Sequence, residues 1–185
     1  MALAVTLSDM KEHLRVDITD EDDLITMYIE AATTYIEEAT KRRFINATET
    51  KVQEEFYTPQ RLAYSPLSSV TSITYYDTDN AQQMLSTDVY GVVTGDAGFI
   101  YLKYNQTWPD LYDRPDAITI SYISGYGAAA TTTPKWANQL IKLLCENWYT
   151  HRGLVTEHNS RSAVTEISPT IITQIEMYKI QEVAY

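Results

Sequence analysis

The sequence has few of the residues on which small catalytic and metal sites depend. It contains one cysteine, Cys145, and three histidines among 185 residues. A single cysteine excludes an intrachain disulfide and fits a reducing compartment. The histidines, His13, His151 and His158, form no HExxH motif and no pair at helical spacing, so the usual zinc ligands are missing. We therefore expect no metal site and no cofactor.

Enzyme motifs are missing as well. There is no GxSxG, no phosphate loop and no GxGxxG, and Cys145 falls in an apolar pattern that favours a buried, inert thiol over a nucleophile. Any acidic chain offers carboxylate pairs by chance, so we predict no catalytic residue and keep a small carboxylate-dependent hydrolase as a remote alternative. The carboxylates that such a hydrolase would use are Glu54, Glu55, Asp110, Asp113 and Asp116.

Basic residues and long apolar runs are also scarce. The chain has 14 Lys and Arg against 25 Asp and Glu, a formal charge of -11, which argues against sequence-independent binding of nucleic acid. No apolar run approaches the roughly 18 residues of a membrane span, and the first residues lack the features of a secretory signal. Tyrosine, by contrast, occurs 15 times, which indicates either interfaces or half-buried strands.

Helical periodicity marks both ends of the chain. A short helix is expected over Leu7–Val16, capped by Thr6 or Ser8, and a second from an N-cap at Thr19 or Asp20 to about Arg43. We interpret the basic residues 41–43 as charges at the helix end, in preference to a phosphate-binding patch.

The most pronounced helix is predicted over Pro134–Gly153. Its apolar residues recur at spacings of three and four, as on one face of an amphipathic helix. We expect this face to form a core with Ile25, Ile29 and Ile36 of the second helix. The residues that carry the expectation are Trp136, Leu140, Leu144 and Trp148.

Between these helices the pattern changes to alternation. From Thr48 to Tyr126, about five short runs rich in β-branched and aromatic residues are separated by turn signals, which predicts an antiparallel sheet. The predicted fold class is therefore α+β, in one domain. Residues 1–47 and 128–185 form a helical body of about four helices, and residues 48–127 form an inserted β subdomain.

The C-terminal part divides at Pro169. Residues Leu154–Ser168 are polar and without period, so we predict a mobile loop or a segment ordered by a partner. A final helix is expected over Pro169–Tyr185. Its apolar side can bury against the chain's own helical body or against another subunit or partner, and the sequence leaves both open. The candidate interface residues are Ile171, Ile172, Ile175, Tyr178 and Tyr185.

Four pieces of the sequence together resemble the tailed-phage head–tail connector family of head completion or adaptor proteins. They are the opening LSDMKEHLRVDITDEDDLITMYIEAATTYIEEATKR, the strand SPLSSVTSITYYD, the strand PDAITISYISGYG, and the helix that ends in NWYTHR. They occur in the order found in that family and cover most of the chain up to Arg152.

The resemblance implies a non-catalytic structural role. Members of the family form a ring, commonly of twelve subunits, between the portal and the neck or tail, around a channel through which DNA passes. The implied partners are therefore other copies of the chain, the portal protein and neck or tail proteins, with no specific DNA binding and no membrane. The implied location is the capsid vertex or neck of the virion, and before assembly it is the host cytoplasm. Another neck or tail-completion protein of a phage is the alternative.

Overall fold

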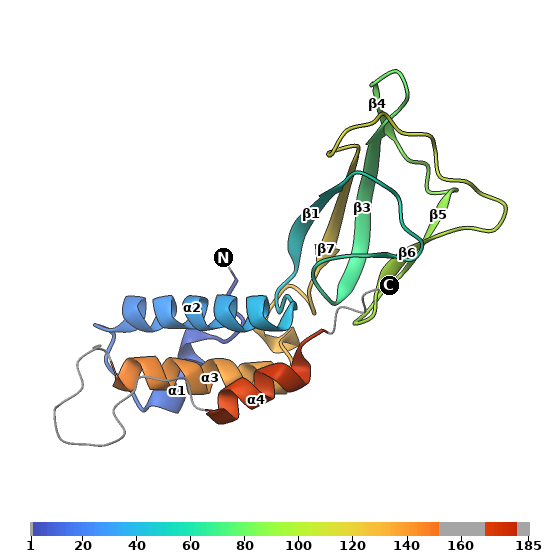
Figure 1. Ribbon diagram of the computed structural model, residues 1–185. Helices are drawn as coiled ribbons and strands as arrows, with labels where there is room; N and C mark the ends of the chain where they lie inside the picture. The colour runs from blue at the N-terminus through green and yellow to red at the C-terminus, as the bar shows by residue number, and fades with distance from the viewer. Residues whose placement is uncertain (1, 152–168, 181–185) are drawn as a thin grey trace. The chain divides into compact units, whose positions relative to one another are not determined.

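The computed structural model describes residues 2–151 and 169–180, which form an α+β fold as predicted (Figure 1). The chain divides into two compact units. The helical unit comprises the described residues of Met1–Ile45 and Gly127–Tyr185, and the β unit comprises Asn46–Tyr126.

The helical unit contains four α-helices and one short 3-10 helix within its described residues. Its second helix ends earlier than predicted, because Lys41 adopts a left-handed conformation with φ of 56° that stops the helix. Its N-cap is Glu21, so the expected cap at Thr19 or Asp20 is wrong, whereas the first helix is capped by Thr6 as expected. The bounds are α1 Leu7–Leu14, α2 Asp22–Thr40, η1 Ala130–Thr132, α3 Lys135–Thr150 and α4 Pro169–Tyr178.

The core of the helical unit lies between α2 and α3, which run side by side in Figure 1. Leu140 and Leu144 are fully buried there, as the spacing predicted. Trp136 and Trp148 are only half-buried, so their expected place in the core is wrong. The side chains that fill the core are Ile25, Ile29, Ala32 and Ile36 of α2, with Ala137, Leu140, Ile141, Leu144 and Cys145 of α3.

Polar contacts hold α1 against this pair. The Lys11 ammonium lies 2.6 Å from the Asp22 carboxylate at the start of α2, and it also donates to the Ile18 carbonyl. His13 of α1 lies 3.1 Å from Glu146 of α3. An acidic residue at the first turn of α2 also complements the helix dipole, so Asp22 serves two purposes.

The β unit contains two antiparallel sheets, where the sequence predicted one. The four-stranded sheet has the order β1-β7-β3-β4, and the three-stranded sheet has the order β2-β6-β5. Strands β2 and β4 were not predicted, because two or three residues are too few to show alternation. The bounds are β1 Ala47–Gln53, β2 Gln60–Arg61, β3 Leu67–Tyr76, β4 Gln82–Met84, β5 Tyr90–Val93, β6 Phe99–Leu102 and β7 Ile118–Ser124.

The two sheets share one core. Ile118, Ile120 and Tyr122 of the central strand β7 are buried, while the alternate residues are only partly covered. The inward-facing residues of both sheets thus pack on one another, and each sheet keeps one outer face. The buried residues of this core are Leu67, Ile73, Leu85, Tyr90, Ile100, Ala117, Ile118, Ile120 and Tyr122.

Candidate assembly site at the C-terminal helix

The predicted interface residues of α4 face in different directions. Ile171 and Ile175 are buried in the helical unit, where α4 packs on α2 and α3. Ile172 is 48% exposed, and Tyr178 is half-buried. Tyr185 lies outside the described residues, as does the segment 154–168. One helix therefore contributes both a buried stripe and an exposed apolar position.

An aromatic cluster fixes the C-terminal end of α4. Tyr178 stacks on Trp136 of α3, with ring centroids 4.0 Å apart and ring planes 8° apart. Phe44 meets the same indole edge-on at 5.6 Å. The Arg42 guanidinium lies 6.0 Å from the indole centroid, within range of a cation–π interaction. We call Arg42, Phe44, Trp136 and Tyr178 the anchor cluster.

Two hydrogen bonds reinforce the anchor cluster through carbonyl groups at helix ends. Arg42 Nε donates to the Tyr178 carbonyl at 2.8 Å, where the last turn of α4 has carbonyls without intrahelical partners. The Ile180 backbone N–H donates to the carbonyl of Thr40, the last residue of α2, at 3.0 Å. The C-terminal ends of α2 and α4 are thus joined to each other.

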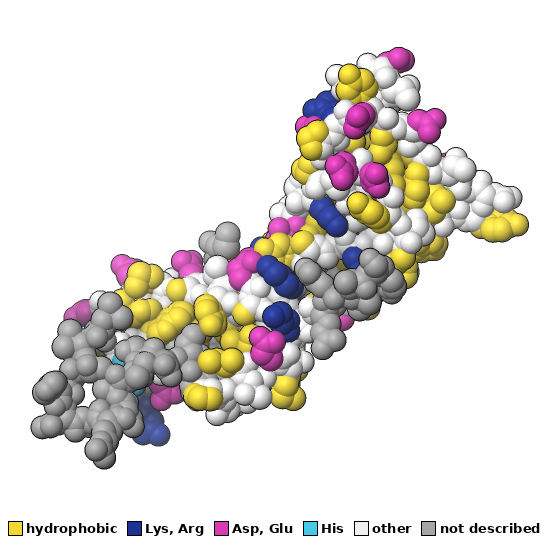
Figure 2. Space-filling model, viewed as in Figure 1, with side chains coloured by type: hydrophobic (Ala, Val, Ile, Leu, Met, Phe, Trp, Pro, Cys, Tyr) yellow, Lys and Arg dark blue, Asp and Glu magenta, His cyan; other side chains and the backbone are white. Residues whose placement is uncertain are grey.

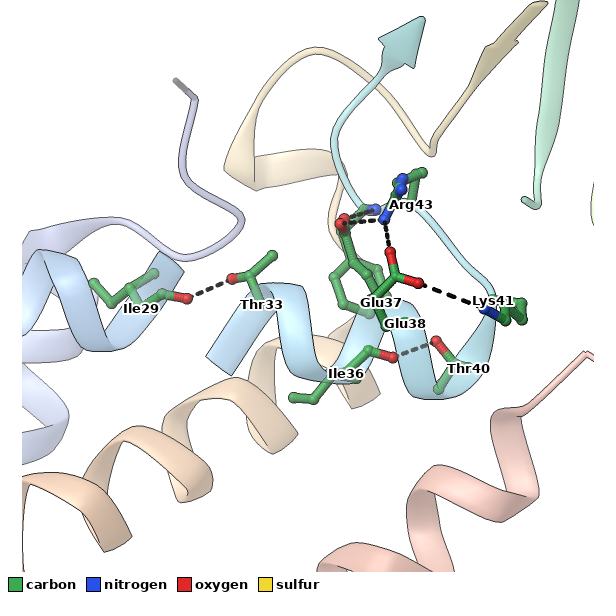
Figure 3. A network of polar contacts seen from close by, with 9 residues as sticks. Ile29, Thr33, Ile36, Glu37, Glu38, Thr40, Lys41 and Arg43 are labelled. Carbon is green, nitrogen blue, oxygen red and sulfur yellow. Dashed lines mark hydrogen bonds and ion pairs between the residues drawn. The ribbon is translucent and has the colours of Figure 1, made fainter. Parts of the chain in front are cut away.

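A half-buried carboxylate, that of Glu37, organises the chain just after α2 (Figure 3). Glu37 accepts a hydrogen bond from the Phe44 backbone N–H at 2.7 Å and pairs with Arg43 at 3.2 Å. Burial raises the pKa of the Glu37 carboxyl above its usual value, although the Phe44 and Arg43 contacts act in the opposite direction. Glu37 therefore positions Phe44, while the partial burial of its carboxylate disfavours the charged form.

The basic residues 41–43 lie past the end of α2, not in its last turn as predicted. Arg43 pairs with Glu37 and Glu38, and Lys41 lies 3.5 Å from Glu38. Arg42 is turned towards α4. Each of the three has a partner within the helical unit, which agrees with the structural interpretation and not with a phosphate patch.

Exposed apolar side chains accompany the charged ones on the helical unit (Figure 2). Met177 is the most exposed of them at 73%, and it lies on α4 with Ile172. Sequence reasoning missed Met177 because the helical pattern alone does not tell which side of α4 is covered.

The described residues offer little for catalysis. They contain no group of three His, Cys, Asp or Glu side chains that could hold a metal ion. Burial raises the pKa of the Cys145 thiol to about 12, so this group is a poor nucleophile. Asp116 pairs with Arg114 at 2.6 Å, and this pairing lowers the pKa of its carboxyl, the opposite of what a general acid needs. No described helix is long and apolar enough to cross a bilayer.

The best-defined cluster among the described residues is thus an aromatic contact within the chain, which holds α4 on the helical unit. Residues 4–93 match the family model of the phage gp6-like head–tail connector protein. The family predicted from the sequence is confirmed over these residues, which run from α1 through β5. No curated protein matches the sequence of the chain.

Solved structures with the same fold come from particles of a gene transfer agent (GTA). A chain in the neck of an empty GTA particle, computed with C6 symmetry, is 19% identical with a TM-score of 0.75, over 98% of this chain and 92% of that one. A chain in the virion of the native GTA particle is 20% identical with a TM-score of 0.73, over the same shares. A chain in the native neck computed with C12 symmetry is 18% identical, with a TM-score of 0.72 over 96% and 90%.

Proposed function

We propose that this chain is a non-catalytic subunit of a head–tail connector ring, located in the neck of a tailed-phage-like particle. The observation that carries the proposal is the extent of the fold likeness. It spans nearly the whole chain and nearly the whole length of chains from particle necks, including the C-terminal part that the family match does not reach.

The symmetry of the similar necks supports a ring. Those structures were computed with C6 and C12 symmetry, and a contact between two different surfaces of one chain closes into a ring of this kind. We propose a ring of this chain with its axis on the DNA path. A charge of -11 supports passage of DNA, because an acidic wall repels phosphates and does not hold the duplex.

We propose further that the C-terminal part of the chain takes part in docking on the portal protein or on a neck protein. Ile172 and Met177 support this, since both are exposed apolar positions on a helix whose other side is anchored. Ile171, Ile175 and Tyr178 contribute indirectly, because they hold α4 in place. Tyr185 remains a candidate contact beyond the described residues.

Electron microscopy of the purified chain, alone and mixed with purified portal rings, tests the proposal. We expect rings with rotational symmetry that dock coaxially on the portal, and native mass spectrometry gives the number of subunits. Docking on a tail or neck component in place of the portal would identify the chain as another neck or tail-completion protein. A chain that stays monomeric in all mixtures would contradict the connector role.

A further inference from the structure

The outer face of the four-stranded sheet carries no charged side chain on its strands. Cross-strand pairing aligns Val52 with Thr119, Thr119 with Thr74, and Thr74 with Met84. The acidic and basic residues of β1, Glu49 and Lys51, alternate to the other face. We call this surface the Ser/Thr face. Its members are Thr48, Thr50, Val52, Ser69, Ser72, Thr74, Met84, Thr119, Ser121 and Ile123.

The lack of charge is notable for this part of the chain. The β unit has ten acidic and four basic side chains, so it is itself strongly acidic. At the end of β3, Tyr76 lies on the same side of the sheet as Thr74, and its ring is covered by Arg114, which pairs with Asp116. Because two copies with a charge of -11 each repel one another, a surface without carboxylates is where they meet at the lowest electrostatic cost.

The three-stranded sheet has a second outer face of different chemistry. Val93 pairs with Phe99 across β5 and β6, and Gly91 pairs with Tyr101. The Tyr101 ring lies over Gly91, where an added Cβ would come within 2.4 Å of the ring. Val93 and Tyr101 remain 40% and 38% exposed. We call Gly91, Val93, Phe99 and Tyr101 the aromatic face, and Arg61 of β2 pairs with Phe99 at its edge, 6.0 Å from the Phe99 ring centroid.

These two faces point to opposite sides of the β unit, because the inner faces of both sheets share one core. A subunit of a closed ring needs two different surfaces on opposite sides, one for each neighbour. We propose that the Ser/Thr face of one copy packs on the aromatic face of the next copy, so that β units join head to tail around the ring. This rests on the proposed ring and names the surfaces that build it.

The size of the Ser/Thr face agrees with a partial interface. Strand spacing and rise give the sheet face an area of about 300–400 Å². A stable contact buries about 800 Å² per partner, so the β units supply about half of it and the remaining area falls elsewhere on the chain. The chemistry also matches, since the Phe99 and Tyr101 rings can cover β-branched side chains of the Ser/Thr face.

Site-directed crosslinking tests the contact directly. The only native thiol, Cys145, is buried, so engineered cysteines are the only ones that react. A chain with both Ser121→Cys and Val93→Cys should give a ladder of covalent multimers with a short bismaleimide at high protein concentration. A mixture of the two single variants should stop at dimers. The matched control, Thr107→Cys with Val93→Cys, places one thiol on an exposed loop and should give no ladder.

Other outcomes would overturn the inference. Dimers from Ser121→Cys alone would show that two Ser/Thr faces meet each other, and the absence of a ladder from the double variant would show no contact. Charge insertion is an independent check, since Ser121→Glu or Thr50→Glu should weaken ring formation at least tenfold, whereas Thr107→Glu should not. If wild type forms rings and both Glu variants assemble normally, the inference fails and the connector role stands. If wild type forms no ring with or without portal, the proposed connector role itself is contradicted, and the inference falls with it.

Discussion

Tyr178 and Trp136 stack at 4.0 Å although they are separated by the whole of the segment that links α3 to α4. The pair closes the helical unit at one end, and Phe44 and Arg42 complete its surroundings. Because α4 is a short helix of ten residues, it depends on tertiary contacts of this kind for its stability.

Replacing Trp136 by alanine should lower the free energy of unfolding by about 2–3 kcal/mol. A fully buried aromatic side chain costs about 3–5 kcal/mol when truncated, and Trp136 is only half-buried. The loss of the stacked Tyr178 ring is included in this figure. Urea denaturation followed by circular dichroism measures the change. Tyr104→Ala, at an exposed tyrosine, should change the stability by less than about 0.5 kcal/mol. Equal effects at both positions would contradict the role of the cluster.

Replacing Arg42 by glutamine should release α4 locally without unfolding α2 and α3. The Tyr178 carbonyl loses its hydrogen bond from Arg42 Nε, and the cation–π contact is lost too. Amide hydrogens of α4 should then exchange faster, while those of Leu140 and Leu144 keep their protection. The matched control is Lys41→Gln, next in sequence, whose exposed side chain lies 3.5 Å from Glu38. Unchanged exchange in α4 would contradict the prediction.

The sequence predicted the elements with strong periodicity. The spacing of Leu140 and Leu144 predicted the buried face of α3, and Pro169 predicted the start of α4. Alternation of side chains predicted the longer strands of the β unit. The fold class followed from these elements, and the family followed from the resemblance of four sequence pieces to the head–tail connector family. Local patterns sufficed there because each element contains several turns or several alternations.

The anchor cluster could not be predicted, because it depends on contacts between distant residues. Arg42 and Tyr178 are 136 positions apart, and no local pattern pairs a basic residue after one helix with the last carbonyl of another. The same limit explains Trp136. Its spacing matches the core stripe, yet its position near the start of α3 places it where α4, and not α2, provides the cover.

The stability of the chain should decrease as the pH rises through the range just above 4.5, to the extent that Glu37 contributes. Its pKa is raised in the folded state, chiefly by burial, so the folded chain binds more protons than the unfolded chain in this range. Its ionisation therefore disfavours folding above the folded-state pKa and has no such effect below 4.5. Glu37→Gln removes this term, so the stability of wild type relative to the variant should fall from pH 4 to pH 7. Denaturation curves across this range measure it, and an opposite trend would contradict the assignment.

Cys145 should stay unreactive in the folded chain. Its thiol is buried, and burial raises its pKa to about 12, so little thiolate is present at pH 8. A coloured thiol reagent should detect no thiol in native protein and one per chain in denaturant. Rapid labelling of native protein would show that α3 opens readily, and it would also remove the basis of the crosslinking design.

Two isoleucines one turn apart on α4 distinguish packing within the chain from docking of a partner. Ile175 is buried against the helical unit, so Ile175→Ala should lower the free energy of unfolding by about 2–4 kcal/mol. Ile172 is exposed, so Ile172→Ser should leave the stability within about 0.5 kcal/mol of wild type. If α4 docks a partner, Ile172→Ser should nevertheless weaken binding to portal or neck proteins, measured by sedimentation with those components. Deletion of residues 169–185 should reduce both the stability and the binding to partners, because it removes the buried stripe and the exposed apolar positions at once. A deletion variant that is as stable as wild type and assembles normally would show that α4 has neither use.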